Sequence, residues 1–135
     1  MNQAFKITGF VAALMVAAPS FAENLAGSEW QPVWLDGADY TPIQETFVGF
    51  DQDGRYAGSA GCNRIMGGFV TNEDAILLGP AAATMMACPS DIAEQEHSFI
   101  AALMSTRFFK RDGITLTLSD SAGALVLKMQ QRDAD

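Results

Sequence analysis

Apolar and polar residues alternate with a period of two in the first half of the chain after residue 22. Residues 46–50 (TFVGF) and 55–60 (RYAGSA) each read as a strand, and residues 51–54 (DQDG) lie between them. Alternation of this kind is typical of strands that are buried on one face. An Asp-Gly pair favours a hairpin turn because glycine adopts positive φ without steric cost. We therefore expect a β-hairpin over residues 46–60.

The same period returns near the C-terminus. The pattern predicts strands at residues 108–110, 114–118 and 124–129, with turns at 111–113 and 119–123. In the middle strand Ile114, Leu116 and Leu118 share one face, and in the last strand Leu125 and Leu127 share one side. Short strands joined by Gly-bearing turns indicate a mainly β fold, a small antiparallel curled sheet or cracked barrel of about 7–8 strands.

Residues 91–105 follow a helical period instead. Their apolar residues form one stripe: Ile92, Phe99, Ile100, Leu103 and Met104. Asp91 and Glu94 have the spacing of a capping box, which predicts the helix N-terminus. We expect one α-helix, inserted before the C-terminal hairpins, that packs its stripe across one end or face of the sheet.

Residues 1–22 have the layout of a secretory signal peptide. Lys6 precedes an apolar stretch over residues 7–18, followed by Pro19 and by small residues at Ser20 and Ala22. The stretch is shorter than the roughly 20 residues of a membrane-spanning helix, although an uncleaved anchor is the alternative. Cleavage is predicted before Glu23, and no Cys follows that site for lipid attachment. We expect a periplasmic or secreted protein without a transmembrane segment, with a single domain over residues 23–135.

The predicted mature chain is acidic. Residues 23–135 keep 7 of the 8 Lys and Arg and all 16 Asp and Glu, so their formal charge is −9. Because nucleic acids bind through clustered basic residues, this composition excludes them as expected partners. A monomer is expected.

Cys62 and Cys88 are the two cysteines of the chain. In an exported protein such a pair most simply forms a disulfide. It would close the loop over residues 62–88 and stabilise the fold by on the order of 3–3.5 kcal/mol. The alternatives are buried free thiols, a reactive thiol or a metal site. The spacing disfavours metal because there is no Cys-x-x-Cys and only one His.

No catalytic arrangement stands out. His97 falls in the middle of the predicted helix and is interpreted as a solvated or half-buried side chain, and Ser59 lacks the context of a nucleophile elbow. Residues 51–54 resemble part of a calcium loop but lack its remaining ligands, so a simple turn is favoured. We expect no catalytic residue, no metal and no cofactor, and therefore a protein that is not an enzyme.

Two features suggest binding. Residues 58–68 are rich in glycine, and Gly61, Asn63, Arg64, Gly67 and Gly68 form a candidate binding loop. Separately, several methionines offer adaptable apolar surface, either as the lining of a cavity or as core filler: Met66, Met85, Met86 and Met104.

Several motifs resemble the META domain family, which includes the HslJ-like bacterial heat-shock proteins. They are residues 25–30 (LAGSEW), 53–55 (DGR), 58–64 (GSAGCNR), 67–69 (GGF), 77–80, 84–88 (TMMAC), 96–99 (EHSF) and 113–118 (GITLTL), with Phe50 and Leu103. Met85 departs from the pattern, because the family often has a basic residue there.

The resemblance implies a small β-rich fold with one helix, an envelope or secreted location, and a part in stress or drug tolerance without established catalytic residues. Thr84, from the TMMAC motif, is counted with the candidate binding loop. The resemblance favours Trp30 as a core residue, whereas the sequence does not decide whether Trp34 is buried. We expect a protein that binds an apolar ligand or an envelope protein, at the mouth of the barrel or at the Gly-rich loop. The alternative is an inhibitor of a secreted hydrolase that presents this loop, which a disulfide would hold rigid.

Overall fold

The computed structural model describes residues 25–132. The predicted signal peptide and its cleavage site lie outside these residues. Within them, α2 is too short and too polar to cross a membrane.

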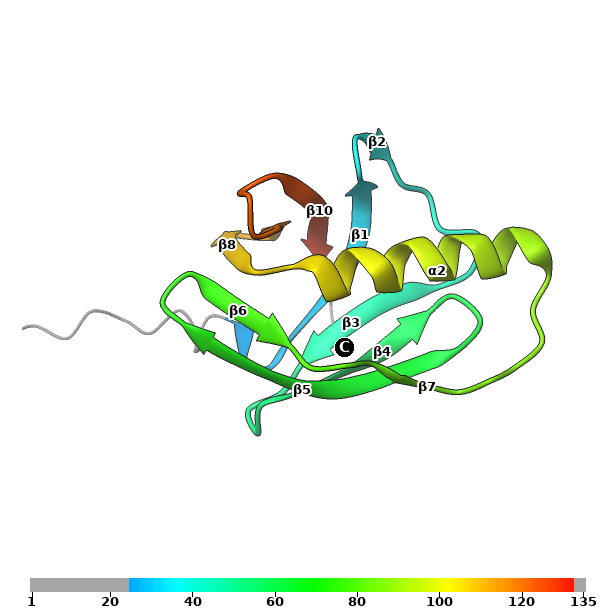
Figure 1. The fold of residues 1–135 in the computed structure, drawn as a ribbon, viewed down its shortest axis with the longest axis horizontal. Coiled ribbons are helices and arrows are strands. Elements are labelled where there is room, and N and C mark those ends of the chain that lie inside the picture. The colour runs from blue at the N-terminus through cyan, green and yellow to red at the C-terminus, as the bar shows by residue number, and fades with distance from the viewer. Residues whose placement is uncertain (1–24, 133–135) are drawn as a thin grey trace, which may run out of the picture.

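Ten strands and one helix make up the described chain (Figure 1). They are β1 Ser28–Leu35, β2 Ala38–Asp39, β3 Thr46–Phe50, β4 Arg55–Ala60, β5 Arg64–Asn72, β6 Ala75–Leu78, β7 Ala82–Ala83, α2 Ser90–Ser105, β8 Phe108–Asp112, β9 Thr115–Ser119 and β10 Leu125–Gln131. The predicted first hairpin is confirmed as β3 and β4.

Eight of the strands close into an antiparallel barrel, in the order β1, β3, β4, β5, β6, β8, β9 and β10, with β10 pairing back to β1. β2 extends from β1, and β7 pairs with β5. The barrel is weakest between β6 and β8, which share a single residue pair, Ala75 and Phe108. The expected cracked barrel with one helix before the C-terminal strands is thus confirmed.

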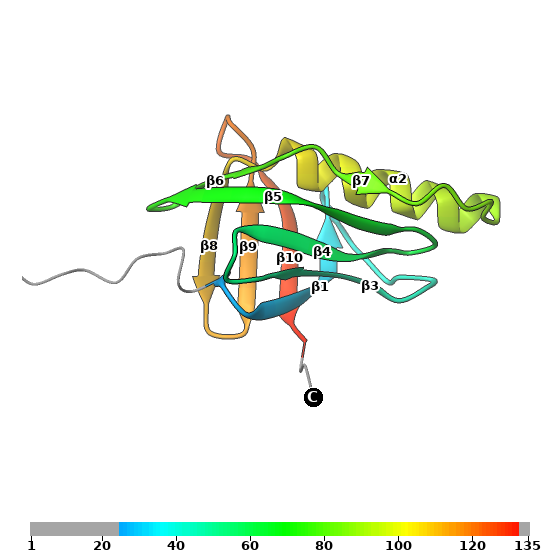
Figure 2. The same cartoon turned by 90° about the horizontal axis from the view of Figure 1, so that it is seen from below.

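The helix completes the barrel by covering part of one layer. Figure 2 shows β3, β4 and β5 running across the direction of β8, β9 and β10. α2 lies over the part of the β3–β4–β5 layer that β8–β10 leave uncovered (Figures 1 and 2). Its buried residues are Ile92, Phe99, Ala102 and Leu103. Their burial against the sheet explains why the helical stripe predicted from the sequence forms.

The interior of the barrel is filled by side chains. Trp30, Tyr56 and Phe99 are fully buried, and leucines of β9 and β10 surround them. Trp30 is therefore a core residue as expected. Trp34 is half-buried, and the ammonium group of Lys128 lies 5.4 Å from its ring centroid.

Three local predictions are wrong. Ile114 lies in the turn before β9 and is 59% exposed, while Leu116 and Leu118 are buried. Leu125 is only half-buried because an irregularity in the β9–β10 register turns both Val126 and Leu127 inward. The expected capping box is absent, because the helix begins at Ser90 with Pro89 as its N-cap. Asp91 therefore lies two residues after the N-cap, and its carboxylate accepts from the Ile92 N–H instead.

Glycines allow the β3–β4–β5 layer to pack closely, and Gly58 is the sharpest case. A Cβ at Gly58 would lie 2.0 Å from the carbonyl oxygen of Phe47 on the paired strand β3. At Gly68, on the neighbouring strand, the nearest atom would be 3.7 Å away. Only the first position leaves no space for a methyl group.

We expect Gly58→Ala to lower the free energy of unfolding by more than about 3 kcal/mol, because a backbone atom must move to admit the methyl group. Gly68→Ala is the matched control and should change it by less than about 1 kcal/mol. Urea denaturation followed by circular dichroism measures both. Equal stability of the two variants would contradict this account of the packing.

Candidate functional site

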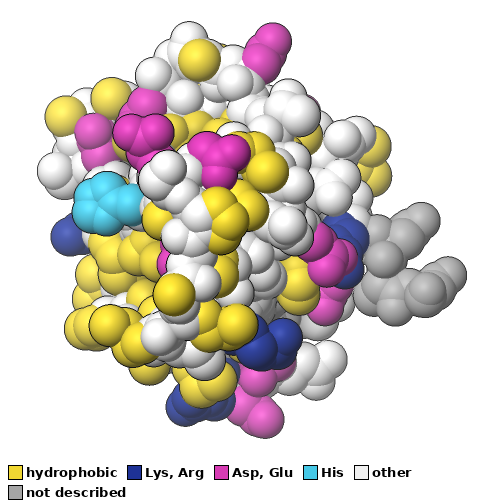
Figure 3. Space-filling view, turned by 90° about the vertical axis from the view of Figure 1, so that its right-hand side faces the viewer, with side chains coloured by type: hydrophobic (Ala, Val, Ile, Leu, Met, Phe, Trp, Pro, Cys, Tyr) yellow, Lys and Arg dark blue, Asp and Glu magenta, His cyan; other side chains and the backbone are white. Residues whose placement is uncertain are grey.

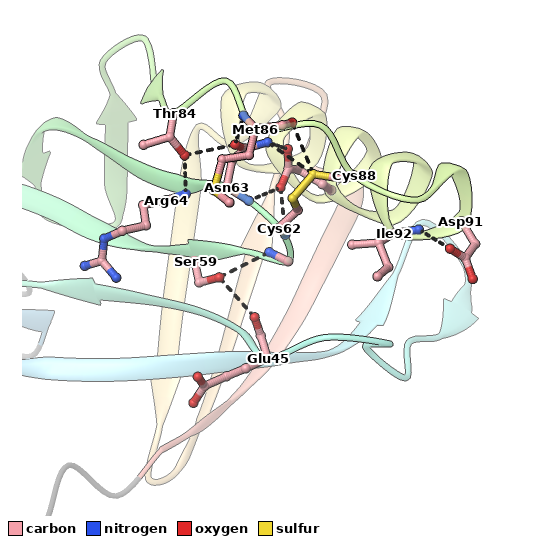
Figure 4. Close-up of a disulfide and its surroundings, with 12 residues drawn as sticks. Glu45, Ser59, Cys62, Asn63, Arg64, Thr84, Met86, Cys88, Asp91 and Ile92 are labelled. Atoms are coloured by element: carbon pink, nitrogen blue, oxygen red, sulfur yellow. Dashed lines mark hydrogen bonds between the residues drawn. A yellow bond between two sulfur atoms is a disulfide. The ribbon is translucent and has the colours of Figure 1, made fainter.

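The side chain of Asn63 ties three segments of the chain together. Asn63 lies in the turn between β4 and β5 and is only 7% exposed. Its amide oxygen accepts from the hydroxyl of Thr84 at 2.9 Å and from the N–H of Met86 at 2.7 Å. Its amide nitrogen donates to a carboxylate oxygen of Glu96 at 2.6 Å. Figure 4 shows Asn63 between Thr84, Met86 and the disulfide.

Glu96, on α2, completes this junction. Its other carboxylate oxygen accepts from the backbone N–H groups of Cys62 and Asn63, at 3.0 and 2.7 Å. The carboxylate thus receives three hydrogen bonds, and bonds to a charged acceptor are stronger than neutral ones. Glu96 therefore fixes the turn to the helix.

The predicted disulfide between Cys62 and Cys88 is present, with Cα atoms 6.1 Å apart. It joins the same turn to residues 80–89, the segment between β6 and α2, which we call the strap. The strap also carries β7 and bonds to β5 through the Thr84 N–H and the Arg64 carbonyl, at 3.1 Å. Covalent and hydrogen bonds therefore hold the strap along its length.

The structure divides the candidate binding loop. Gly61 and Asn63 lie in the turn, with Gly61 at φ +128, and Thr84 lies in the strap. Arg64 begins β5 and is exposed. Gly67 and Gly68 are inside β5, so the prediction of one continuous loop is wrong there. Gly67 is needed for packing instead, because a Cβ would lie 2.6 Å from the ring of Tyr56.

Tyr56 of β4 holds the residue that precedes the strap. Its hydroxyl donates to the carbonyl oxygen of Gly79 at 2.7 Å. Burial raises the pKa of this hydroxyl above its usual value. The phenol therefore stays neutral and acts as a structural donor.

The other residues considered for chemistry take structural or solvent-exposed positions. His97 is exposed on α2. The carboxylate of Asp51 accepts from the N–H groups of Asp53 and Arg55, at 2.9 and 3.0 Å, which makes residues 51–54 a simple turn as predicted. Ser59 donates to the carbonyl oxygen of Glu45 at 3.1 Å.

Three of the four singled-out methionines are exposed, so neither the cavity-lining nor the core-filler interpretation holds for them. Met85 is 94% exposed, Met86 63% and Met66 46%. Met104 packs against the edge of the core. Figure 3 looks onto the end of the molecule with the start of α2 and the β4–β5 turn, and hydrophobic side chains cover much of it.

A second apolar feature lies outside the barrel and was missed from the sequence. Val70 of β5 and Leu77 of β6 face each other across the strands and are 65% and 51% exposed. With Phe108 of β8 they line a hollow of about 430 Å³, rimmed by Arg107. A second hollow of about 300 Å³ shares Val70 and Leu77 with the first and extends to Gly79. We call Val70, Leu77 and Phe108 with these hollows the outer apolar surface.

One signal in the sequence marks this surface. Apolar residues occupy consecutive positions at Phe69 and Val70 and at residues 76–78, where strict alternation would place polar residues facing solvent. Such runs indicate strands that are apolar on both faces. Which face remains uncovered depends on the tertiary structure.

We expect Glu96→Gln to lower the free energy of unfolding by roughly 2 kcal/mol, because the charged acceptor is lost and an amide N–H₂ would face that of Asn63. Glu94→Gln, at an exposed position of the same helix, is the control and should stay within about 0.5 kcal/mol of the wild type. Chemical denaturation measures both. A Glu96→Gln variant as stable as the control would show that the junction contributes little.

The comparisons with known proteins agree with this architecture. The family model of the META domain matches residues 23–133. No curated protein matches the sequence significantly.

Two solved structures share the fold. A DUF4847 family protein from Bacteroides vulgatus ATCC 8482 is 18% identical, with a TM-score of 0.61 over 86% of this chain and 100% of that one. A protein from Burkholderia xenovorans is 19% identical, with a TM-score of 0.64 over 93% of this chain and 99% of that one. Identities this low support the fold alone, whereas the family model covers all of the described residues. The chain therefore belongs to the META domain family.

Proposed function

We propose that this protein is a non-enzymatic, exported protein of envelope stress or drug tolerance that acts by binding an apolar ligand at the outer apolar surface. The observation that carries the proposal is the exposed Val70–Leu77 pair beside the hollow of about 430 Å³. This volume lies within the range of small-molecule sites, and such sites are mainly apolar. An apolar molecule there would cover side chains that otherwise contact water.

The site differs from the mouth of the barrel considered in the sequence analysis. Trp30, Phe50 and Tyr56 fill the interior, and α2 packs against the barrel with Phe99 and Leu103. A ligand at the outer apolar surface would need no rearrangement of this core. Export is supported by the pattern of residues 1–22 and by the Cys62–Cys88 disulfide, which persists in oxidising compartments.

The test is a native mass spectrum of the protein purified without reductant from a bacterial periplasm. We expect a population with added mass that dissociates as an apolar molecule. Leu77→Glu should remove that mass, because a carboxylate would have to be desolvated against the bound ligand. Ile114→Glu changes an apolar residue of similar exposure in the β8–β9 turn and should retain it. A bare wild-type protein, or the same adduct in all three proteins, would reject the proposal.

A second candidate function is inhibition of a secreted hydrolase. The observation in its favour is the position of Met85, which is 94% exposed on the strap. On either side of Met85 the strap is fixed to the β4–β5 turn, by hydrogen bonds to Asn63 and by the disulfide of Cys88. A segment fixed in this way loses little conformational entropy when it enters a cleft. The strap, rather than the Gly-rich stretch of β5, would be the inserted segment.

Under this second candidate, Met85→Ala should weaken inhibition at least tenfold, because it removes the protruding side chain without touching the junction. Met66→Ala, on β5, is the control and should inhibit as the wild type does. The measurement is residual activity of a muramidase and a serine protease at increasing protein concentration. Absence of inhibition of both enzymes would remove the support for this candidate. Asn63 is unsuitable for the test because its buried amide holds the turn itself.

A further inference from the structure

The strap forms an uncovered edge of the sheet. β7 pairs with β5 through Ala82 and Ala83, and no further strand is paired with it among the described residues. Residues 82–87 are all exposed, and residues 84–89 contain no turn or bend. In Figure 2 the strap runs along the border of the layer that contains β5. The chain therefore presents an extended segment with one free side.

The hydrogen-bond pattern shows which backbone groups face that free side. The N–H of Thr84 donates to the Arg64 carbonyl, and the N–H of Arg64 donates to the Thr84 hydroxyl, so these two residues face each other as a bonded pair. In an antiparallel ladder such pairs alternate with pairs whose backbone groups point away from each other. Ala83, which faces Ile65, is therefore of the second kind. Its N–H and C=O point away from β5.

The same alternation continues along the strap. The N–H of Thr84 and the N–H of Met86 both point toward β5 and the Asn63 turn, where each has its acceptor. The N–H of Met85, between them, then points to the free side. Ala83 and Met85 thus expose backbone groups at alternate residues, which is the spacing that a neighbouring β-strand can pair with.

This edge lacks the usual protection against another strand. Residues 75–90 contain no Asp, Glu, Lys or Arg. Proteins commonly place charges or bulges on exposed edges because an open row of N–H and C=O groups is a template for pairing. Here Pro80 and Pro89 bound the segment, but the residues between them are small or apolar. The disulfide and the Asn63 junction hold this edge in place.

We propose that the free edge of the strap binds an extended, apolar polypeptide segment of another protein, which adds as a further antiparallel or parallel strand beyond β7. A polypeptide is the ligand whose own N–H and C=O groups match the edge, whereas an apolar small molecule would leave them unpaired. Side chains such as Met85 supply adaptable apolar contacts beside the ladder.

Charge decides against a second copy of the chain as the occupant. The chain carries a formal charge of −8, and α2 begins directly after the strap with the exposed carboxylate of Asp91. Figure 3 shows several acidic side chains on this end of the molecule. Arg64 lies on the β5 side of the strap. Two copies would bring like charges together, so the partner strand is one flanked by basic residues.

This proposal goes beyond ligand binding at the outer apolar surface, because it uses backbone groups of a different segment. The probe is a fluorescein-labelled peptide of alternating Val and Thr, nine residues long, with two lysines at each end. Its binding is measured by fluorescence anisotropy with the unreduced protein. A second version carries N-methyl groups on two adjacent central residues, which removes a donor from each edge of the peptide.

We expect the wild type to bind the first peptide and to bind the N-methylated peptide at least tenfold more weakly. Ala83→Pro removes the outward N–H without removing a bond to β5, so it should weaken binding at least tenfold. Ala83→Val keeps the N–H and should bind as the wild type does. Thermal unfolding monitors the fold of each variant, and Met85→Pro, which removes the next outward N–H, replaces Ala83→Pro if that variant is unfolded.

Three results would overturn the proposal: no binding by the wild type, equal binding of the two peptides, or equal binding by the proline and valine variants. The proposal would also be overturned if sedimentation showed that the wild type is a dimer and that Ala83→Pro is a monomer, because the strand beyond β7 would then come from a second copy. Leu77→Glu should bind the peptide normally, and Ala83→Pro should keep any apolar adduct. Failure at the strap is therefore distinguishable from failure at the outer apolar surface.

Discussion

The fold depends on the satisfaction of one buried amide. Asn63 is almost fully buried, and burying a polar side chain is unfavourable unless its hydrogen bonds are made. Its partners come from the strap and from α2, so the amide is satisfied only when the β4–β5 turn, the strap and the helix are all in place. The helix is therefore held against the turn by the hydrogen bonds of Glu96 as well as by its apolar stripe. The Cys62–Cys88 disulfide links two of these three parts covalently.

This junction is needed because strand pairing closes the barrel only weakly at one place. β6 and β8 share one residue pair, and the chain between them passes through the strap and α2. The strap pairs with β5, and α2 packs on the neighbouring layer with Phe99 and Leu103. The connection between β6 and β8 is thus fixed by the junction rather than by a continuous ladder. Both surfaces to which we assign binding border this connection.

The elements that local signals specify were predicted closely. β3 and β4 match their expected bounds because residues 46–60 combine a period of two with an Asp-Gly turn. The helix was found from its apolar stripe, but its N-cap is Pro89, two residues before Asp91, so the predicted capping box does not form. The errors at Ile114 and Leu125 arose at a turn and at a register irregularity. At both places the partner strand decides which side chain faces inward.

The sequence by itself determined the fold class and the family and favoured a disulfide between the two cysteines, because periodicity, turn chemistry and motif spacing are local or discrete properties of the chain. The tertiary structure alone decided what those residues do. Gly67 and Gly68 became positions inside β5, and at Gly67 the ring of Tyr56 packs where a side chain would be. Met85 and Met86 became surface because the strap lies outside β5. The outer apolar surface and the free edge of the strap exist only once strands distant in sequence have paired. Which face of an apolar strand stays exposed depends on the elements packed against it, so the local sequence pattern does not predict it.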